Sequence, residues 1–176
     1  MSDTAKTLTP KLVKKLWMAF VLLVILMGAS YIAITSYFGN MHHQETAQRL
    51  DAEVANHVIA EKFQDASPFL EDGSVNKPLF GDLMHDMMAV NRGIEVYLLD
   101  DTGSILYSVV LDPNDKDATK SVSLAPINSF IADKGEKFVL GDDPRNPEEQ
   151  KIFSVAPYSI DGHKGFVYII LAGKKF

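Results

Sequence analysis

The short segment from Leu140 to Arg145 holds the residues best suited to bind a small charged molecule. Its sequence is LGDDPR, in which glycine and proline favour a tight turn. The guanidinium of Arg145 can form two parallel hydrogen bonds with a carboxylate, so it could hold an anionic ligand. It could instead pair with Asp142 or Asp143 and hold the turn, and an arginine in an acidic loop usually has such a structural partner. Both interpretations stay open at this point.

Two groups of polar side chains have spacings similar to those of metal ligands. The loop of residues 112–117, DPNDKD, lacks the glycine and the terminal glutamate of a complete EF-hand, so we expect a solvated loop. Asp82, His85 and Asp86 would share one face of a helix, and this spacing can ligate zinc. With no fourth ligand nearby, we interpret these three residues as an exposed polar face.

Nucleophilic and cofactor chemistry has no support in the sequence. The chain contains no cysteine, which excludes disulfides, thiolate metal sites and cysteine nucleophiles. Ser108, Ser154 and the five histidines fall into neither a Ser-His-Asp order nor a G-x-S-x-G pattern. We therefore predict no catalytic residue, no metal site and no cofactor within these 176 residues.

Charge is distributed unevenly along the chain. The net formal charge is −6, whereas residues 1–16 carry four lysines and one aspartate, a net of +3. Residues 17–176 are therefore acidic, with a net charge of −9. Phosphates would repel such a body, and it has no basic stripe, so we expect no nucleic-acid partner.

Residues 17–38 form a run of 22 residues without a charge, WMAFVLLVILMGASYIAITSYF. As a helix this run reaches about 33 Å, enough to cross a hydrocarbon core of about 30 Å. Trp17 and Tyr37 suit the two membrane interfaces, and the preceding lysines place residues 1–16 in the cytoplasm and residues 39–176 outside. A cleaved signal peptide has a shorter apolar region and a small-x-small site, so an uncleaved anchor is favoured.

The exported part is predicted to contain helices followed by strands. Residues 40–62 lack proline and glycine and place Leu50, Val54 and Val58 at helical spacing, which predicts an amphipathic helix that could also contact a second copy. The other predicted elements are a loop over 64–78, a helix over 78–90, strands over 94–99 and 104–111, a helix over 124–132, and strands over 137–140, 151–160 and 165–172. This order predicts an α+β domain with one five-stranded antiparallel sheet and its helices on one side.

The element order is similar to that of PAS-like, or Cache, sensor domains of bacterial membrane receptors. Three segments, MAVNRGIEVYLLDDTGSILYS, LAPINSFI and LGDDPRNPEEQKIFSVAPYSIDGHKGFVYIILAG, resemble the N-terminal extracytoplasmic region of two-component sensor histidine kinases. EVYLLDDTGSIL is shared loosely by many PAS-like sensors, whereas LGDDPR followed by KIFSVAP is narrower. The resemblance runs from the transmembrane segment to the last residue. It implies a PAS-like (Cache) fold with a long N-terminal helix, preceded by one transmembrane helix.

The resemblance also implies where a ligand would bind. PAS-like sensors typically hold small ligands between the sheet and the loops and helices that cover it. The candidate ligand-binding residues that the resemblance implies on these elements are Arg145, Lys151, Ser154, Tyr97, Tyr107 and Ser108.

The function implied by the resemblance is signal input. The chain would be the sensor region of a homodimeric histidine kinase in the bacterial inner membrane, with residues 39–176 in the periplasm detecting an unidentified small molecule or protein. In that family a second transmembrane helix, a HAMP linker and a kinase follow, so we interpret the chain as the sensory part of a longer protein. The alternative is a stand-alone membrane-anchored adaptor that binds a partner protein and has no kinase output.

Overall fold

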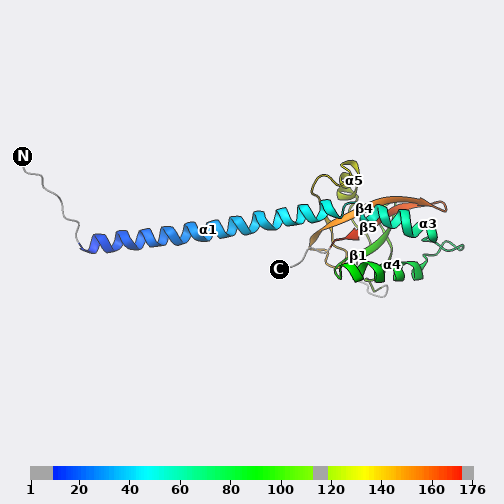
Figure 1. Cartoon of the computed structure of the whole chain (residues 1–176), viewed down its shortest axis with the longest axis horizontal. Helices are drawn as coiled ribbons and strands as arrows, with labels where there is room; N and C mark the ends of the chain where they lie inside the picture. The colour runs from blue at the N-terminus through cyan, green and yellow to red at the C-terminus, as the bar shows by residue number, and fades with distance from the viewer. Residues whose placement is uncertain (1–9, 113–118, 172–176) are drawn as a thin grey trace, which may run out of the picture. The chain divides into compact units, whose positions relative to one another are not determined.

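The computed structural model describes residues 10–112 and 119–171 and divides into two compact units, the first ending at His42 and the second beginning at His43. Helix α1 (Pro10–Leu50) begins in the first unit and ends in the second. The second unit contains the other helices and all described strands (Figure 1). These elements are α2 (Val54–His57), the π-helix η1 (Val58–Lys62), α3 (Phe63–Asp65), α4 (Lys77–Val90), β1 (Glu95–Asp100), β2 (Ile105–Ser108), α5 (Leu124–Ala132), β3 (Leu140–Asp142), β4 (Gln150–Ile160) and β5 (His163–Ile170).

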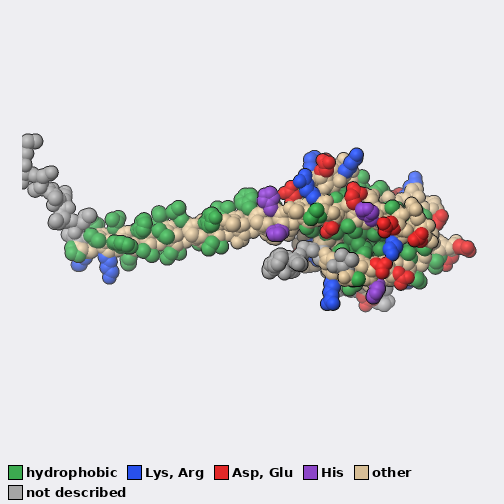
Figure 2. Space-filling model, in the orientation of Figure 1, with side chains coloured by type: hydrophobic (Ala, Val, Ile, Leu, Met, Phe, Trp, Pro, Cys, Tyr) green, Lys and Arg blue, Asp and Glu red, His purple; other side chains and the backbone are tan. Residues whose placement is uncertain are grey.

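The first part of α1 is an apolar helix without protein cover. The whole predicted span of residues 17–38 is helical, and the most apolar stretch of the helix has no buried residue. Figure 2 shows the apolar side chains along this helix. Within the described part of the chain, it is the one helix long and apolar enough to cross a membrane, by length and composition.

The sheet is five-stranded and antiparallel throughout, with the spatial order β2-β1-β5-β4-β3. The predicted α+β class, the five strands and the long N-terminal helix are therefore confirmed. Strands β4 and β5 are joined by Asp161 and Gly162, whose φ angles are +51° and +80°. Positive φ at both turn residues is the requirement of a type I′ hairpin, and a D-G pair meets it. Residue 172, in the last predicted strand, lies outside the described residues.

Helices cover both faces of the sheet, contrary to the expectation of helices on one side. Phe63 of α3 and Phe80 and Leu83 of α4 are buried against one face, whereas Ile127 and Phe130 of α5 are buried against the other. Figure 1 places α5 and α4 on opposite sides of the strands. The physical reason lies in β1, β4 and β5, whose continuous apolar runs bury side chains on both faces and so need cover on both.

The helix predicted over residues 40–62 is interrupted by a turn directly after Leu50. Leu50 was expected on the buried face, but it is 79% exposed, whereas Val58 is buried as expected. The turn is held by Ser154 of β4, whose hydroxyl donates to the Ala52 carbonyl (2.7 Å) and accepts from the Ala55 N–H (3.1 Å). The interruption changes the phase of the helix, so that residues before and after it do not share one face.

A tyrosine hydroxyl crosses the sheet at Gly165. Tyr158 on β4 lies opposite Gly165 on β5, and its hydroxyl donates to the Leu99 carbonyl on β1 at 2.9 Å. Burial, with a smaller effect of the nearby Asp100 carboxylate, raises the pKa of Tyr158 to about 12, so the hydroxyl keeps its proton at neutral pH. The missing side chain of Gly165 leaves the space through which this bond passes.

Candidate functional site

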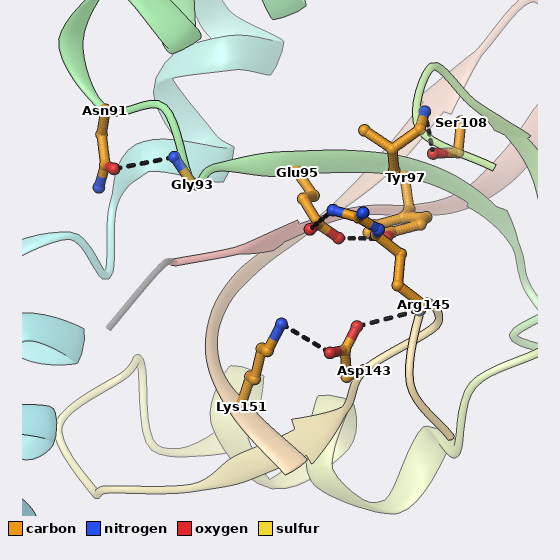
Figure 3. Close-up of polar contacts among 9 residues, drawn as sticks. Asn91, Gly93, Glu95, Tyr97, Ser108, Asp143, Arg145 and Lys151 are labelled. Carbon is orange, nitrogen blue, oxygen red and sulfur yellow. Dashed lines mark hydrogen bonds and ion pairs between the residues drawn. The ribbon is translucent and has the colours of Figure 1, made fainter. Parts of the chain in front are cut away.

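Four charged side chains at one end of the sheet form two ion pairs, and we call Glu95, Asp143, Arg145 and Lys151 the charged cluster. Arg145 Nη1 lies 2.9 Å from Glu95 Oε1, and Lys151 Nζ lies 2.6 Å from Asp143 Oδ2. Figure 3 shows Arg145 reaching toward Glu95 and Lys151 pointing at Asp143. The Asp143 carboxylate also accepts the Arg145 backbone N–H at 3.0 Å, so the two pairs are joined.

Three parts of the chain position the charged cluster. Glu95 is the first residue of β1, Lys151 lies near the start of β4, and Asp143 and Arg145 follow β3. The loop after β3 is closed by the Asp143 N–H, which donates to the Glu149 carbonyl at 3.2 Å. Because β1 and β4 both pair with β5, residues far apart in the sequence meet at this end of the sheet.

Burial differs sharply between the acids and the bases of the charged cluster. The side chains of Glu95 and Asp143 are 8% and 1% exposed, whereas those of Arg145 and Lys151 are 57% and 32% exposed. A buried carboxylate is costly unless it is paired and hydrogen-bonded, so the two bases stabilise the acids beneath them. The hydrogen bond to Glu95, together with its charge, raises the pKa of Arg145 above its ordinary value.

The second carboxylate oxygen of Glu95 accepts a hydrogen bond from Tyr97. These residues are two apart on β1 and share one face, and the Tyr97 hydroxyl donates to Glu95 Oε2 at 2.5 Å. Tyr97 is wholly buried, and burial followed by the bond to Glu95 raises the pKa of its hydroxyl. The phenol therefore stays protonated and remains a donor to the carboxylate.

The six ligand-binding candidates do not gather in one place. Arg145 and Lys151 belong to the charged cluster and Tyr97 contacts it, whereas the hydroxyl of buried Ser154 holds the turn after α1. Ser108 is the register partner of Tyr97 on β2, and its hydroxyl accepts the Val110 N–H at 3.2 Å.

Tyr107 lies apart from the charged cluster. Its ring contacts the Phe80 ring edge-on at a centroid distance of 5.5 Å, and Lys77 Nζ lies 6.0 Å from its centroid. It packs against the core on the helix α4 face of the sheet, whereas Tyr97 belongs to the core on the α5 face.

The structural partner expected for Arg145 differs from the one found. The sequence indicated Asp142 or Asp143, but the Arg145 side chain pairs with Glu95, fifty residues earlier in the chain. Asp143 instead pairs with Lys151, and the Asp142 carboxylate accepts the Ser123 N–H at 2.8 Å. The side-chain partner was missed because it comes from another strand.

Of the three residues with metal-like spacing on α4, Asp86 has a charged partner on another helix. Asp86 forms an exposed ion pair with Lys62 at 2.7 Å, which raises the pKa of Lys62 and lowers that of Asp86. Across residues 10–112 and 119–171 no group of three or more His, Asp or Glu side chains could hold a metal ion. Asp115 and Asp117 of the acidic loop lie outside the described residues.

Gln48, like Glu95, is a buried polar residue that the sequence-based predictions did not include. It is 1% exposed, and its Nε2 donates to the Val139 carbonyl (2.7 Å) and the Phe153 carbonyl (3.0 Å). Its Oε1 accepts the Val139 N–H at 3.0 Å, so one amide joins the end of α1 to β4 and to the residue before β3.

For Glu95 the sequence did contain a signal, because it is a lone acid in the apolar strand EVYLL and buried acids are rarely unpaired.

No family model, no curated protein and no solved structure matches this chain. The geometry therefore stands alone as the basis for a function. It offers one exposed cation, Arg145, and one partly exposed cation, Lys151, each paired with a buried carboxylate. This arrangement is suited to binding a charged molecule and to responding structurally when a pair is broken.

Proposed function

We propose that the chain is the signal-input part of a membrane sensor of the PAS-like (Cache) type, as found in two-component sensor histidine kinases. The observation that carries the proposal concerns β3, β4 and the residues next to them. They hold the Asp143–Lys151 pair of the charged cluster and, through Gln48, also the end of α1. The element order of two strands, α5 and three further strands, after the N-terminal helices, supports it, because this is the order expected for such sensors.

The charged cluster suits the detection of a stimulus. A charged molecule arriving from solvent meets Arg145 and Lys151 first, because their side chains are far more exposed than those of Glu95 and Asp143. An anion bound to Arg145 or Lys151 competes with the carboxylate that it already holds. Either carboxylate would then lie buried without a cation, which favours a rearrangement of the strands around it.

Helix α1 supplies the anchor and the route inward. Its apolar part follows Lys11, Lys14 and Lys15, so we place its start at the cytoplasmic face of a bacterial inner membrane and the second unit in the periplasm. The helix passes from the apolar stretch to Gln48 without an interruption, so a displacement of its end is carried along it. A second copy of the chain and a kinase would receive that displacement.

The orientation is tested by labelling introduced cysteines, since the chain has none of its own. Leu12→Cys and Leu50→Cys place one thiol near each end of α1, at side chains that are 51% and 79% exposed. In intact cells, a membrane-impermeant maleimide should label the cysteine at position 50, and it should label position 12 only after lysis. The reverse pattern would contradict the orientation, and recovery of the chain without membranes would contradict the anchor.

Stimulus binding is tested on the full chain in lipid nanodiscs by thermal unfolding. Small carboxylates, amino acids, divalent cations and pH values from about 5 to 8 are the stimuli examined. A ligand at about a hundredfold its Kd should raise the Tm by about 5–10 °C. Arg145→Gln should abolish that shift, whereas Lys62→Gln, which removes the exposed pair with Asp86, should retain it. If no stimulus shifts the Tm, ligand sensing is wrong and partner binding by an adaptor becomes the better proposal.

A further inference from the structure

We propose that β3 and β4 form a relay in which Gln48 is the positioning residue: breaking the Asp143–Lys151 pair loosens the strands that hold Gln48 and so frees the end of α1. The relay deepens the proposed sensing function and rests on it for the origin of the disturbance. Its physical basis is that the same two strands contact the charged cluster at one point and the helix at another.

Gln48 fixes the end of α1 to β4 and to the residue before β3 with three hydrogen bonds. Both ends of its amide are used, through two donations and one acceptance; the Gln48 side chain is buried, the bond to the Phe153 carbonyl is buried, and the two bonds with Val139 are partly buried. The neighbouring Arg49 donates from Nε to the Glu136 carbonyl at 3.2 Å. The last turn of the helix is therefore held by the connection between α5 and β3 as well as by β4.

The first route from the charged cluster to Gln48 runs along β3. This strand is three residues long, lies at the edge of the sheet and pairs with β4 alone. Val139, directly before it, exchanges two hydrogen bonds with Gln48, and Asp143, directly after it, pairs with Lys151. Because so short an edge strand has few ladder bonds, its position depends strongly on the contacts at its two ends.

The second route runs across the sheet through three register partners, one each on β4, β5 and β1. Phe153, whose carbonyl accepts from Gln48, lies opposite Ile170 of β5, and Ile170 lies opposite Glu95 of β1. Phe153, which holds the helix through Gln48, and Glu95, which holds Arg145, thus lie at the same level of the sheet, with Ile170 between them. A shift of β1 or β5 at this level changes the position of the Phe153 carbonyl.

The energetics favour movement of β3 when the ion pair is lost. An unpaired carboxylate as buried as that of Asp143 is strongly unfavourable, whereas opening a three-residue edge strand exposes the carboxylate to water. Tyr168 opposes this opening, because its hydroxyl donates to the Asp142 carbonyl at 2.8 Å. The strand is therefore held at its start by the hydrogen bonds between Val139 and Gln48, and at its end by Tyr168 and the Asp143–Lys151 pair. After loss of the ion pair, its position depends more strongly on Tyr168 and Gln48.

The test is hydrogen exchange of the full chain in nanodiscs, with the Val139 amide as the reporter because it donates to Gln48. In Lys151→Met, this amide should exchange at least tenfold faster than in the unmodified chain. If Lys151→Met does not fold, Asp143→Asn breaks the same pair without leaving a buried charge, and the Val139 amide should again exchange faster, by a smaller factor than in Lys151→Met. By reciprocity, Gln48→Met should speed exchange of the Asp143 amide.

Two controls separate the relay from a general loss of stability. Tyr158→Phe removes the hydrogen bond from β4 to the Leu99 carbonyl of β1, and Lys62→Met breaks an ion pair between two helical segments. Neither should change Val139 exchange by more than twofold under native conditions. Equal acceleration in Tyr158→Phe and Lys151→Met would overturn the relay.

The movement of the helix end is read by a spin label on Leu50→Cys. In the Lys151→Met background the label should become more mobile, and in the Tyr158→Phe background its spectrum should not change. Faster Val139 exchange with an unchanged label would overturn the proposal, because the disturbance would then stop at Gln48. These measurements need no stimulus, so their failure is distinct from a failure of ligand sensing.

Discussion

Replacing Gly165 with alanine is expected to lower the free energy of unfolding by about 3 kcal/mol, the upper part of the usual range for overpacking. A Cβ at this position would overlap the Leu99 carbonyl oxygen, and it would lie 2.8 Å from the Tyr158 hydroxyl and 2.9 Å from the Asp100 Cα. Two of these three neighbours are backbone atoms of β1, so the strain cannot be relieved by a side-chain rotation. Strands β1 and β5 would have to separate.

Gly81→Ala in α4 is the matched control for this substitution. An added Cβ there meets no atom within 4 Å, and alanine is favoured over glycine inside a helix by up to about 1 kcal/mol. We expect Gly81→Ala to raise the urea midpoint of the full chain in nanodiscs and Gly165→Ala to lower it. Equal midpoints for the two variants would contradict the close approach of β1 and β5 at Gly165.

Replacing Lys151 with methionine is expected to destabilise the domain by about 2–3 kcal/mol. The substitution keeps the length of the side chain and removes the ammonium, which leaves Asp143 buried without its ion-pair partner. A fully buried pair would cost about 3–5 kcal/mol when broken, but the Lys151 side chain is about one-third exposed and water screens part of the effect. Urea unfolding at neutral pH measures the difference.

Lys62→Met removes the ammonium of the exposed pair with Asp86, whose two side chains are 40% and 57% exposed. It should lower the stability far less than Lys151→Met does, because exposed ion pairs contribute little. Added salt should reduce the effect of Lys62→Met more than that of Lys151→Met, because solvent ions reach the exposed pair. If the two variants lose the same stability, the burial of Asp143 has no energetic consequence and our reasoning on the charged cluster is wrong.

The elements that could be predicted from sequence are those with a strong local signal. Helix α5 was predicted over residues 124–132 and has these bounds, since a short apolar segment with a proline in its first turn favours a helix start. The β4–β5 hairpin followed from the D-G pair between two β-rich runs. Strand β3 was predicted over 137–140 but covers 140–142, because its sequence has no alternation and its register is set by pairing with β4.

The polar contacts depended on tertiary structure and could not be read from neighbours in sequence. Gln48 is buried and Leu50 is exposed, the reverse of what their polarity predicts for an amphipathic helix. The amide of Gln48 is buried because it bonds to the carbonyls of Val139, directly before β3, and of Phe153 on β4, which lie 91 and 105 residues further on. The pairing of Arg145 with Glu95 likewise requires the strand order, which the sequence alone does not specify.

The π-helical turn η1 has a consequence for the spacing of the residues around it. Val58 and Phe63 are five residues apart, yet both are 6% exposed and pack in the same core. In an α-helix, residues five apart point in clearly different directions, whereas a π-turn, with its i→i+5 bonds, brings them to the same side. The segment thus accommodates one residue more than regular winding would, and the additional residue falls at the exposed Ala60 and Glu61. Length differences of a single residue at this point would alter the winding of the helix while leaving both buried side chains in place.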